Sequence, residues 1–353
     1  MRRLFLVTLI YFFAIVAFAQ APDDYYSSAQ NKHGKQLMEA LHNIINNHTV
    51  LSYTPGLWNA FYETDMRTDG KVWDMYSSCS YTFGDDQDSG SGGTVECDVY
   101  NREHSFPRSW FGGAIDPMNT DLFHIYPTDK KVNAVRSDYP FGEVGTASYT
   151  SSNGSKLGSS SFAGYSGTVF EPIDEYKGDF ARTYFYMATR YFDQMHTWSN
   201  EVTNGTQHPA FEEWVVDLLL EWHQNDPVSE KEIDRNNVIF EKYQHNRNPF
   251  IDHPEFAVRI WGDESTSDHI EGENPFSVYP NPANDFINLT GLYMGEGEVI
   301  IYSAMGAEMK RFNKGLHTQS IRIPTSDLSD GIYLLLVKTP TYRESVKLII
   351  SRQ

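Results

Sequence analysis

Glu103 and His104 are neighbours within a segment rich in reactive side chains, residues 100–105. Successive side chains of an extended strand point to opposite sides, so an adjacent glutamate and histidine can do different work at one site. A carboxylate binds a hard metal ion, and a histidine with an ordinary pKa of about 6.5 accepts a proton near neutral pH. The pair therefore predicts a site at which a bound cation and a general base act together.

Hydrolysis of a phosphodiester needs an activated water molecule and positive charge beside the phosphate oxygens. Glu103 and the amide oxygen of Asn133 are predicted to hold Mg²⁺, which favours oxygen ligands and keeps several of its waters, with Ca²⁺ or Mn²⁺ as alternatives. His104 is the predicted general base. Arg136 follows Asn133 by three positions, so on a helix it shares the same face and is predicted to meet the phosphate.

Two more polar residues, Asp121 and His124, are three positions apart and are predicted to contact and orient the residues that bind metal and substrate. Each of these residues is weak information when taken alone. A Glu-His pair is ordinary surface chemistry in most proteins, and a lone asparagine such as Asn133 is more often a cap or a turn. The prediction depends on their combination.

That combination resembles the endonuclease I family of secreted, non-specific bacterial nucleases, which carry a ββα-metal finger. The resemblance covers residues 25–262, and it implies that His104 activates water while Glu103 and Asn133 coordinate the metal. It also implies that Asn133 lies on a helix packed against the hairpin that bears Glu103 and His104, and that DNA is the substrate, with RNA as a further one. The segments that carry it are Arg102-Glu103-His104 with Pro107, Asp121-Leu122 with Pro127, Asn133 with Arg136, and residues 140–144, 181–191 and 246–254.

The chain departs from the family pattern at one point. Some members carry an arginine in a cysteine-rich insertion after the Glu-His motif, where it is thought to stabilise the phosphate in the transition state. Here residues 111–118 are short and contain no arginine. That role stays open between Arg108, Arg136 and Arg182, and Arg108 and Arg182 are predicted to contact substrate.

The elements around these residues indicate a mixed α+β domain over residues 20–262. Apolar residues at helical spacing predict helices over 35–47, 178–193 and 211–223. A further helix is predicted after Pro227, where Ser229 and Glu232 have the spacing of a capping box. Residues 52–115 are broken by Gly, Pro, Asp and Ser, which predicts loops and short strands.

After a polar linker over residues 263–275 the pattern changes to short, strand-like runs, which predict a small all-β sandwich over 276–353. Its segments 278–283, 328–333 and 347–350 resemble the C-terminal sorting domain of proteins exported by the type IX secretion system. The resemblance implies that the type IX machinery is a partner and that this domain is a secretion address without a catalytic part. The alternative is a binding or adhesion module. The predicted strands are 276–279, 286–289, 298–302, 321–323, 332–337 and 345–349.

Residues 1–19 have a basic start, a short apolar run and an Ala17-Phe18-Ala19 cleavage signal, which together predict a signal peptide. No later segment is apolar enough to predict a membrane span. The protein is therefore expected to be secreted, either free outside the cell or at its surface. Export to an oxidising compartment predicts a disulfide between the two cysteines, Cys79 and Cys97.

The net charge of −19 opposes diffuse attraction to nucleic acid, so a nuclease site must act through a local cluster and bound cations. Two other functions stay open on these grounds. A phosphodiesterase for small substrates fits the acidic chain better than a nuclease does. A secreted binding or adhesion protein on a degenerate nuclease fold would be favoured if Glu103, His104 or Asn133 were missing, and all three are present.

Overall fold

The computed structural model describes residues 21, 22, 24–262, 277–290, 298–303, 307–313, 320–338 and 343–352. The chain divides into two compact units, Met1–Asp263 and Glu264–Gln353. The predicted signal peptide over 1–19 and the predicted linker over 263–275 lie outside the described residues.

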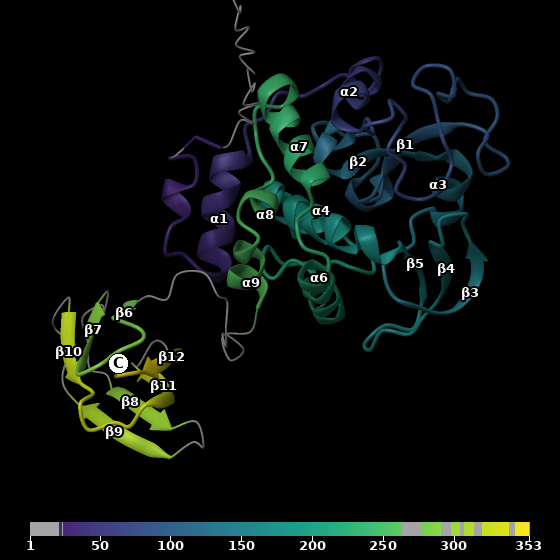
Figure 1. The fold of residues 1–353 in the computed structure, drawn as a ribbon. Coiled ribbons are helices and arrows are strands. Elements are labelled where there is room, and N and C mark those ends of the chain that lie inside the picture. Colours follow the sequence, from purple (N-terminus) through teal and green to yellow (C-terminus); the bar gives the residue numbers. More distant parts are fainter. Residues whose placement is uncertain are drawn as a thin grey trace, which may run out of the picture. The chain divides into compact units, whose positions relative to one another are not determined.

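The first unit is a mixture of helices and short antiparallel strands, as the α+β prediction required (Figure 1). Its described helices are α1 (Gly34–Ile45), α2 (Gly56–Thr64), α3 (Lys130–Arg136), α4 (Lys177–Arg190), α5 (Phe192–Met195), α6 (Glu213–Asn225), α7 (Glu230–Val238), α8 (Pro249–Asp252) and α9 (Glu255–Trp261). Its described strands are β1 (Tyr100–His104), β2 (Ile125–Asp129), β3 (Val144–Thr150), β4 (Lys156–Ser160) and β5 (Thr168–Glu171).

Helix α4 is buried along its whole length and contacts α1, α6 and α8 (Figure 1). Its aromatic residues, Phe180 among them, belong to the main hydrophobic core. Burying charge on such a helix is costly unless each charge is paired. Asp179 accordingly forms an ion pair with Lys231 at 2.7 Å, and Arg182 forms one with Glu232 at 2.5 Å. Lys231 and Glu232 both lie in the first turn of α7. These pairs fix α7 against the central helix.

Helices α1, α4 and α6 form where the apolar spacing predicted them, and α7 forms after Pro227, where the capping-box spacing predicted a helix. The capping box is also present, since Glu232 accepts a hydrogen bond from the Ser229 backbone at 2.9 Å and Ser229 accepts one from the Glu232 backbone at 3.4 Å. Helix α2 was missed, because it lies in the stretch that was predicted to be loops and strands. Its start at Pro55 and Gly56 gives the local signal of a turn, and the burial of Leu57 stabilises the helix instead.

Strands β1 and β2 and helix α3 form a continuous ββα unit. The two strands pair antiparallel, with Tyr100 opposite Asp129 and His104 opposite Ile125. Asp129 ends β2, and its Oδ1 accepts a hydrogen bond from the Val132 backbone N–H at 2.9 Å, so the same residue caps α3. The helix therefore begins directly where the hairpin ends. Strands β3, β4 and β5 follow as a separate antiparallel sheet.

The second unit contains two antiparallel sheets, ordered β10-β7-β6 and β12-β11-β8-β9. Inward side chains from both sheets, such as Ile287, Leu335 and Leu348, share one hydrophobic core, which makes the unit the predicted β-sandwich. Strand β9 was missed because its polar sequence at the sheet edge lacks apolar alternation. The strands are β6 (Ser277–Tyr279), β7 (Phe286–Thr290), β8 (Glu298–Ser303), β9 (Glu308–Asn313), β10 (Ser320–Pro324), β11 (Gly331–Lys338) and β12 (Arg343–Ile350).

Among the described residues, no helix has both the length and the apolar character that a membrane crossing requires.

Candidate active site

One face of β1 is turned toward α3. Asn101 Oδ1 accepts a hydrogen bond from Asn133 Nδ2 at 2.8 Å, and Glu103 Oε1 accepts one from Arg136 Nη1 at 3.2 Å. Asn101 and Glu103 are two residues apart on the strand, and Asn133 and Arg136 are three apart on the helix. The strand and helix periodicities therefore bring the two predicted metal ligands, Glu103 and Asn133, to the same junction.

The other face of β1 is turned toward Tyr53. The Arg102 guanidinium lies 3.6 Å from the centre of the Tyr53 ring, and the His104 ring is nearly parallel to that ring at 6.1 Å. Glu103 and His104 therefore project to opposite sides of the strand, as their adjacency predicted. One neighbour is held against a helix while the other lines the opposite wall.

His104 is held in one tautomer. Its Nε2 lies 3.1 Å from the carbonyl oxygen of Asn119, and a carbonyl only accepts, so Nε2 carries the proton and Nδ1 is a free base. Within the part of the chain that the structure describes, Nδ1 has no hydrogen-bond partner. Burial, with the nearby ring of His124, lowers the pKa of His104 well below its ordinary value, so the imidazole is neutral at neutral pH.

Glu103 is buried, with only 3% of its surface exposed. Its Oε1 accepts hydrogen bonds from Tyr76 Oη at 2.8 Å and from Arg136. Burial raises the pKa of Glu103 above its ordinary value, although Arg136 and Tyr76 both oppose that shift. Its carboxylate is thus held rigidly by one oxygen, while the residue also lines a cleft.

Arg136 is fully buried, and this placement differs from the predicted contact with phosphate. Its guanidinium donates to Glu103, to the backbone oxygen of His104 at 3.2 Å and to that of Ser105 at 2.6 Å. It also lies over the Phe141 ring at 4.7 Å. No local pattern of residues predicted this burial. The contacts make Arg136 a support for Glu103 and for the end of β1.

A cleft of about 330 Å³ opens beside β1 and α3. It brings together three predicted residues of the reaction, Glu103, His104 and Asn133, together with Arg108, whose side chain is exposed. The residues that line it are Tyr53, Trp58, Asp88, Asn101, Arg102, Glu103, His104, Pro107, Arg108, Ser109, Asn133, Ser137 and Asp138.

His124 and Asp121 do not line this cleft, and their surroundings differ. The His124 ring is edge-on to the His104 ring at 5.4 Å, and its Nε2 donates to the Met118 carbonyl at 2.6 Å. Asp121 is fully buried and accepts hydrogen bonds from Tyr186 Oη at 2.9 Å and from Gln244 Nε2 at 3.0 Å. His124 can therefore position the His104 ring directly, whereas Asp121 stabilises the core beneath it.

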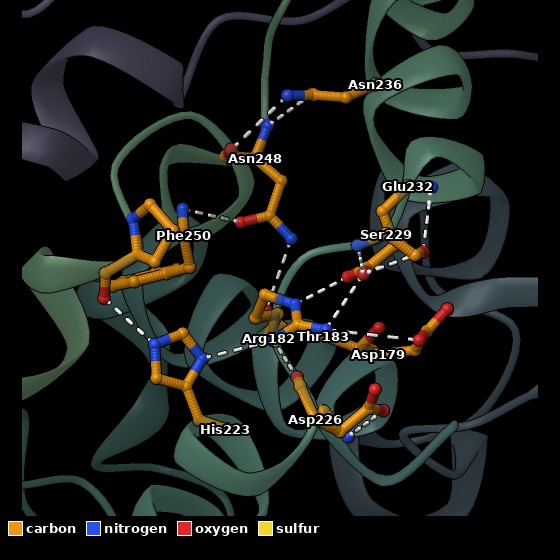
Figure 2. Close-up of polar contacts among 12 residues, drawn as sticks. Asp179, Arg182, Thr183, His223, Asp226, Ser229, Glu232, Asn236, Asn248 and Phe250 are labelled. Atoms are coloured by element: carbon orange, nitrogen blue, oxygen red, sulfur yellow. Dashed lines mark hydrogen bonds and ion pairs between the residues drawn. The ribbon is translucent and has the colours of Figure 1, made fainter. Parts of the chain in front are cut away.

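Arg182 belongs to a separate buried network and does not line the cleft (Figure 2). Its Nε and Nη2 donate to the two oxygens of Glu232 at 2.5 Å and 2.8 Å, and its Nη1 donates to the backbone oxygen of Asp226 at 2.8 Å. Every part of the guanidinium fork is thus used inside the core. The structure does not bring Arg182 together with Glu103, His104 and Asn133.

The predicted disulfide between Cys79 and Cys97 is present, with 5.2 Å between the Cα atoms. It lies beside Asp129, whose Oδ2 accepts hydrogen bonds from the Cys97 backbone N–H at 2.7 Å and from Tyr81 Oη at 2.5 Å. Because Asp129 Oδ1 caps α3, one carboxylate connects the bridge to the helix that carries Asn133.

Several residues of the site were not identified from the sequence. Asn101 offered a signal, because it precedes Glu103 by two positions and must share its face of a strand. Tyr53, Tyr76 and Asp129 offered little, because the first two come from irregular segments and the third is an ordinary helix cap. Only the fold brings them to β1 and α3.

The donor set fits a hard divalent cation. Asn101 Oδ1 accepts a hydrogen bond from Asn133 Nδ2. The side-chain oxygen of Asn133 is thereby left free to act as a ligand beside the Glu103 carboxylate. The described residues contain no cluster of three or more His, Cys, Asp and Glu side chains that could hold a metal. One carboxylate and one amide oxygen suit Mg²⁺, which retains several waters and takes further oxygens from its substrate.

The chain is similar to known proteins over both units. A family model described as Endonuclease I matches residues 33–255, and a model described as Secretion system C-terminal sorting domain matches residues 277–351. An extracellular ribonuclease of Bacillus subtilis (strain 168) is 40% identical over 248 residues, which cover 68% of this chain and 78% of the relative. An extracellular ribonuclease of Bacillus amyloliquefaciens is 38% identical over 257 residues, which cover 70% and 81%.

These matches confirm both resemblances, and the sorting domain identifies the protein as secreted. A ββα unit that carries Glu103, His104 and Asn133 into one cleft is the structural counterpart of the match over the first unit. The chain belongs to the endonuclease I family, and it is a nuclease that hydrolyses phosphodiester bonds.

Proposed function

We propose that this protein is a metal-dependent endonuclease of low specificity that uses His104 as its general base. The observation that carries the proposal is the state of His104 at the cleft. Its Nε2 proton is held by the Asn119 carbonyl, and its Nδ1 is left free to take a proton from water. The lowered pKa keeps this base unprotonated, so no proton has to leave before the reaction begins.

Glu103 and Asn133 would hold the cation, with Mg²⁺ as the proposed ion and Ca²⁺ or Mn²⁺ as alternatives. When bound, the cation supplies positive charge to the phosphate oxygens and the leaving oxygen. The protein's part is to fix its two ligands. Arg136 and Tyr76 orient the Glu103 carboxylate, and Asn101 orients the Asn133 amide.

Arg108 is proposed to contact the scissile phosphate. Its side chain is exposed and lines the cleft together with His104, which neither Arg136 nor Arg182 does. Arg136 is proposed as a positioning residue, since it is fully buried and its Nη1 and Nη2 donate to Glu103 and to backbone oxygens. Arg182 is proposed to act only in the core.

DNA and RNA are both proposed as substrates. A base that activates water does not need the 2′-hydroxyl of ribose, so the same arrangement of residues serves either nucleic acid. The two relatives named extracellular ribonuclease support cleavage of RNA. The sorting domain supports recognition by the type IX secretion machinery.

The test is degradation of plasmid DNA and of RNA by the purified protein, with Mg²⁺ or with EDTA. His104→Ala is expected to reduce the rate about 10²–10⁴-fold, because general-base catalysis contributes about that much. His196→Ala is the matched control, since His196 is exposed and outside the cleft. Undiminished cleavage by His104→Ala would remove His104 as the base.

A second candidate, a phosphodiesterase for small substrates, is favoured by the net charge of −19. The same preparation separates the two functions when it is given a small chromogenic phosphodiester. Rapid hydrolysis of this compound with little action on plasmid would favour the small-substrate enzyme.

A further inference from the structure

We infer that Arg102 binds the phosphate of a nucleotide next to the scissile one and so gives the cleft a second phosphate subsite. This inference rests on the proposed endonuclease function and deepens it, since it makes a chain of at least two phosphates the preferred substrate. Four observations on Arg102 and its neighbours support it.

The first observation is that the Arg102 side chain is held in place before any substrate binds. Its guanidinium lies over the Tyr53 ring at 3.6 Å and over the Trp58 ring at 4.3 Å. Its Nη1 donates to the backbone oxygen of Tyr53 at 2.5 Å and to Thr54 Oγ1 at 2.8 Å. An arginine fixed in this way loses little conformational entropy when it binds an anion.

The second observation is that part of its donor fork is unused. Among the described residues, no hydrogen bond is made by Arg102 Nε or Nη2, and neither atom is buried without a partner. These two nitrogens are the pair that binds a phosphate in the bidentate arrangement. Arg102 also lines the cleft, so both donors are reachable from the space that holds the substrate.

The third observation is that no carboxylate neutralises Arg102 within the described residues. Four of the five buried arginines described in this unit are paired in this way, and the fifth, Arg190, donates to His48 instead. The pairs are Arg136 with Glu103, Arg182 with Glu232, Arg235 with Asp65 and Arg247 with Asp252. Arg102 is half-buried and charged, which is unfavourable without an anionic partner.

Asp88 is the acidic side chain of the cleft whose negative charge acts on Arg102, but it is already bound to Lys130 at 2.9 Å. Its charge is therefore offset without Arg102. The missing counter-ion of Arg102 is supplied most simply by the substrate itself.

The fourth observation is the spacing. Arg102 and His104 are two residues apart on β1 and share the face turned toward Tyr53. Their Cα atoms are then about 6.6 Å apart, since an extended strand rises about 3.3 Å per residue. This distance is about one nucleotide step along an extended sugar-phosphate backbone, so the phosphate at Arg102 neighbours the one attacked at His104.

A different role for Arg102 must be separated from this one. The same contacts could serve only to tie residues 53 and 54 to β1, in which case Arg102 would affect stability and all substrates alike. The subsite instead requires an effect that depends on a particular phosphate of the ligand. The experiment therefore varies the ligand as well as the protein.

The probes are three thymidine dinucleotides, one with no terminal phosphate, one with a 5′-phosphate and one with a 3′-phosphate. Each is used as an inhibitor of plasmid cleavage, and its inhibition constant is measured. In the wild-type protein, one of the two terminal phosphates is expected to tighten inhibition about 10- to 100-fold, as a charge-assisted bidentate contact does.

In Arg102→Gln the advantage of that phosphate is expected to fall close to one, while inhibition by the unphosphorylated dinucleotide stays unchanged. Arg102→Lys keeps the charge but loses the fork, and it should keep only part of the advantage. Arg67→Gln is the matched control, because Arg67 is exposed and pairs with Asp69 at 2.8 Å. It should retain the full advantage.

Three results would overturn the subsite: no preference for either terminal phosphate in the wild type, a preference that survives in Arg102→Gln, or equal weakening of all three dinucleotides. The wild-type comparison alone can refute the idea if the glutamine variant does not fold. Failure of the proposed function gives a different result, since the wild type would then not cleave plasmid at all.

Discussion

At the scale of single residues, the site depends on side chains that are held by one group and offered to another. One carboxylate oxygen of Glu103 accepts hydrogen bonds from Tyr76 and Arg136, and one ring nitrogen of His104 donates a hydrogen bond to the Asn119 carbonyl. Each residue keeps its remaining atom for the reaction. Such support fixes geometry before substrate arrives, which is where much of the catalytic advantage of an enzyme arises.

The turn that carries Tyr76 contains a buried acid, Asp74. Its side chain accepts hydrogen bonds from the Tyr76 backbone N–H at 2.8 Å and from Ser77 Oγ. Burial raises the pKa of Asp74 from its ordinary value to about 7. Between its ordinary pKa and pH 7, the folded protein therefore holds a proton that the unfolded chain has released.

Stability from this group is expected to fall as pH rises through that range and to be lowest above pH 7. Asp74→Asn removes the ionisation, so the variant should gain about 1–3 kcal/mol in free energy of unfolding over the wild type at pH 8, and little at pH 4. Urea unfolding of both proteins at the two pH values measures this difference. A gain of the same size at both pH values would contradict the burial of an ionising Asp74; Asp69→Asn, at the surface, is the control.

At the scale of elements, the ββα unit is secured from outside by the disulfide. Cys97 donates its backbone N–H to Asp129, and Asp129 caps the helix that carries Asn133. Replacing both cysteines by serine is expected to cost about 2–4 kcal/mol of stability, because the bridge closes a loop of 18 residues. It should also weaken metal-dependent activity by loosening α3.

Thermal unfolding and the Mg²⁺ concentration needed for half-maximal plasmid cleavage check this expectation together. The informative result is a rise in the Mg²⁺ requirement at temperatures where the variant is still folded. Loss of stability with an unchanged Mg²⁺ requirement would show that the bridge does not act on α3.

The elements also show what sequence patterns can and cannot predict. Strand alternation correctly separated Glu103 from His104, helical spacing located α1, α4 and α6, and the capping-box spacing located α7. The same spacing placed Arg136 beside Asn133 but could not tell whether its guanidinium faced solvent or Glu103. Burial is decided by what the rest of the chain packs above a residue, and no local pattern contains that information.

At the scale of the whole molecule, the two units have separate hydrophobic cores. The residues proposed to act on substrate all lie in the first unit. A chain that ends at residue 262 is therefore expected to keep its plasmid cleavage rate within about a factor of two. The same truncation should stop export, because the sorting domain is lost.

The plasmid cleavage rate of the purified truncated protein measures the first effect. The distribution of the truncated protein between cells and medium in a culture that produces it measures the second. A truncated protein that folds but does not cleave would show that the second unit contributes to the reaction. Truncated protein found in the medium would show that export does not depend on the sorting domain.

The alternation of β1 also limits how this gene can change over time. Asn101 and Glu103 serve α3, while Arg102 and His104 serve the opposite wall. Insertion or deletion of a single codon within the strand would move every side chain beyond the change to the opposite face, so that the base and the metal ligand would no longer point toward their own partners. Substitutions, or length changes in the following loop, leave the alternation of side chains along β1 intact. The length of this short strand is therefore constrained more tightly than the length of the loop that follows it.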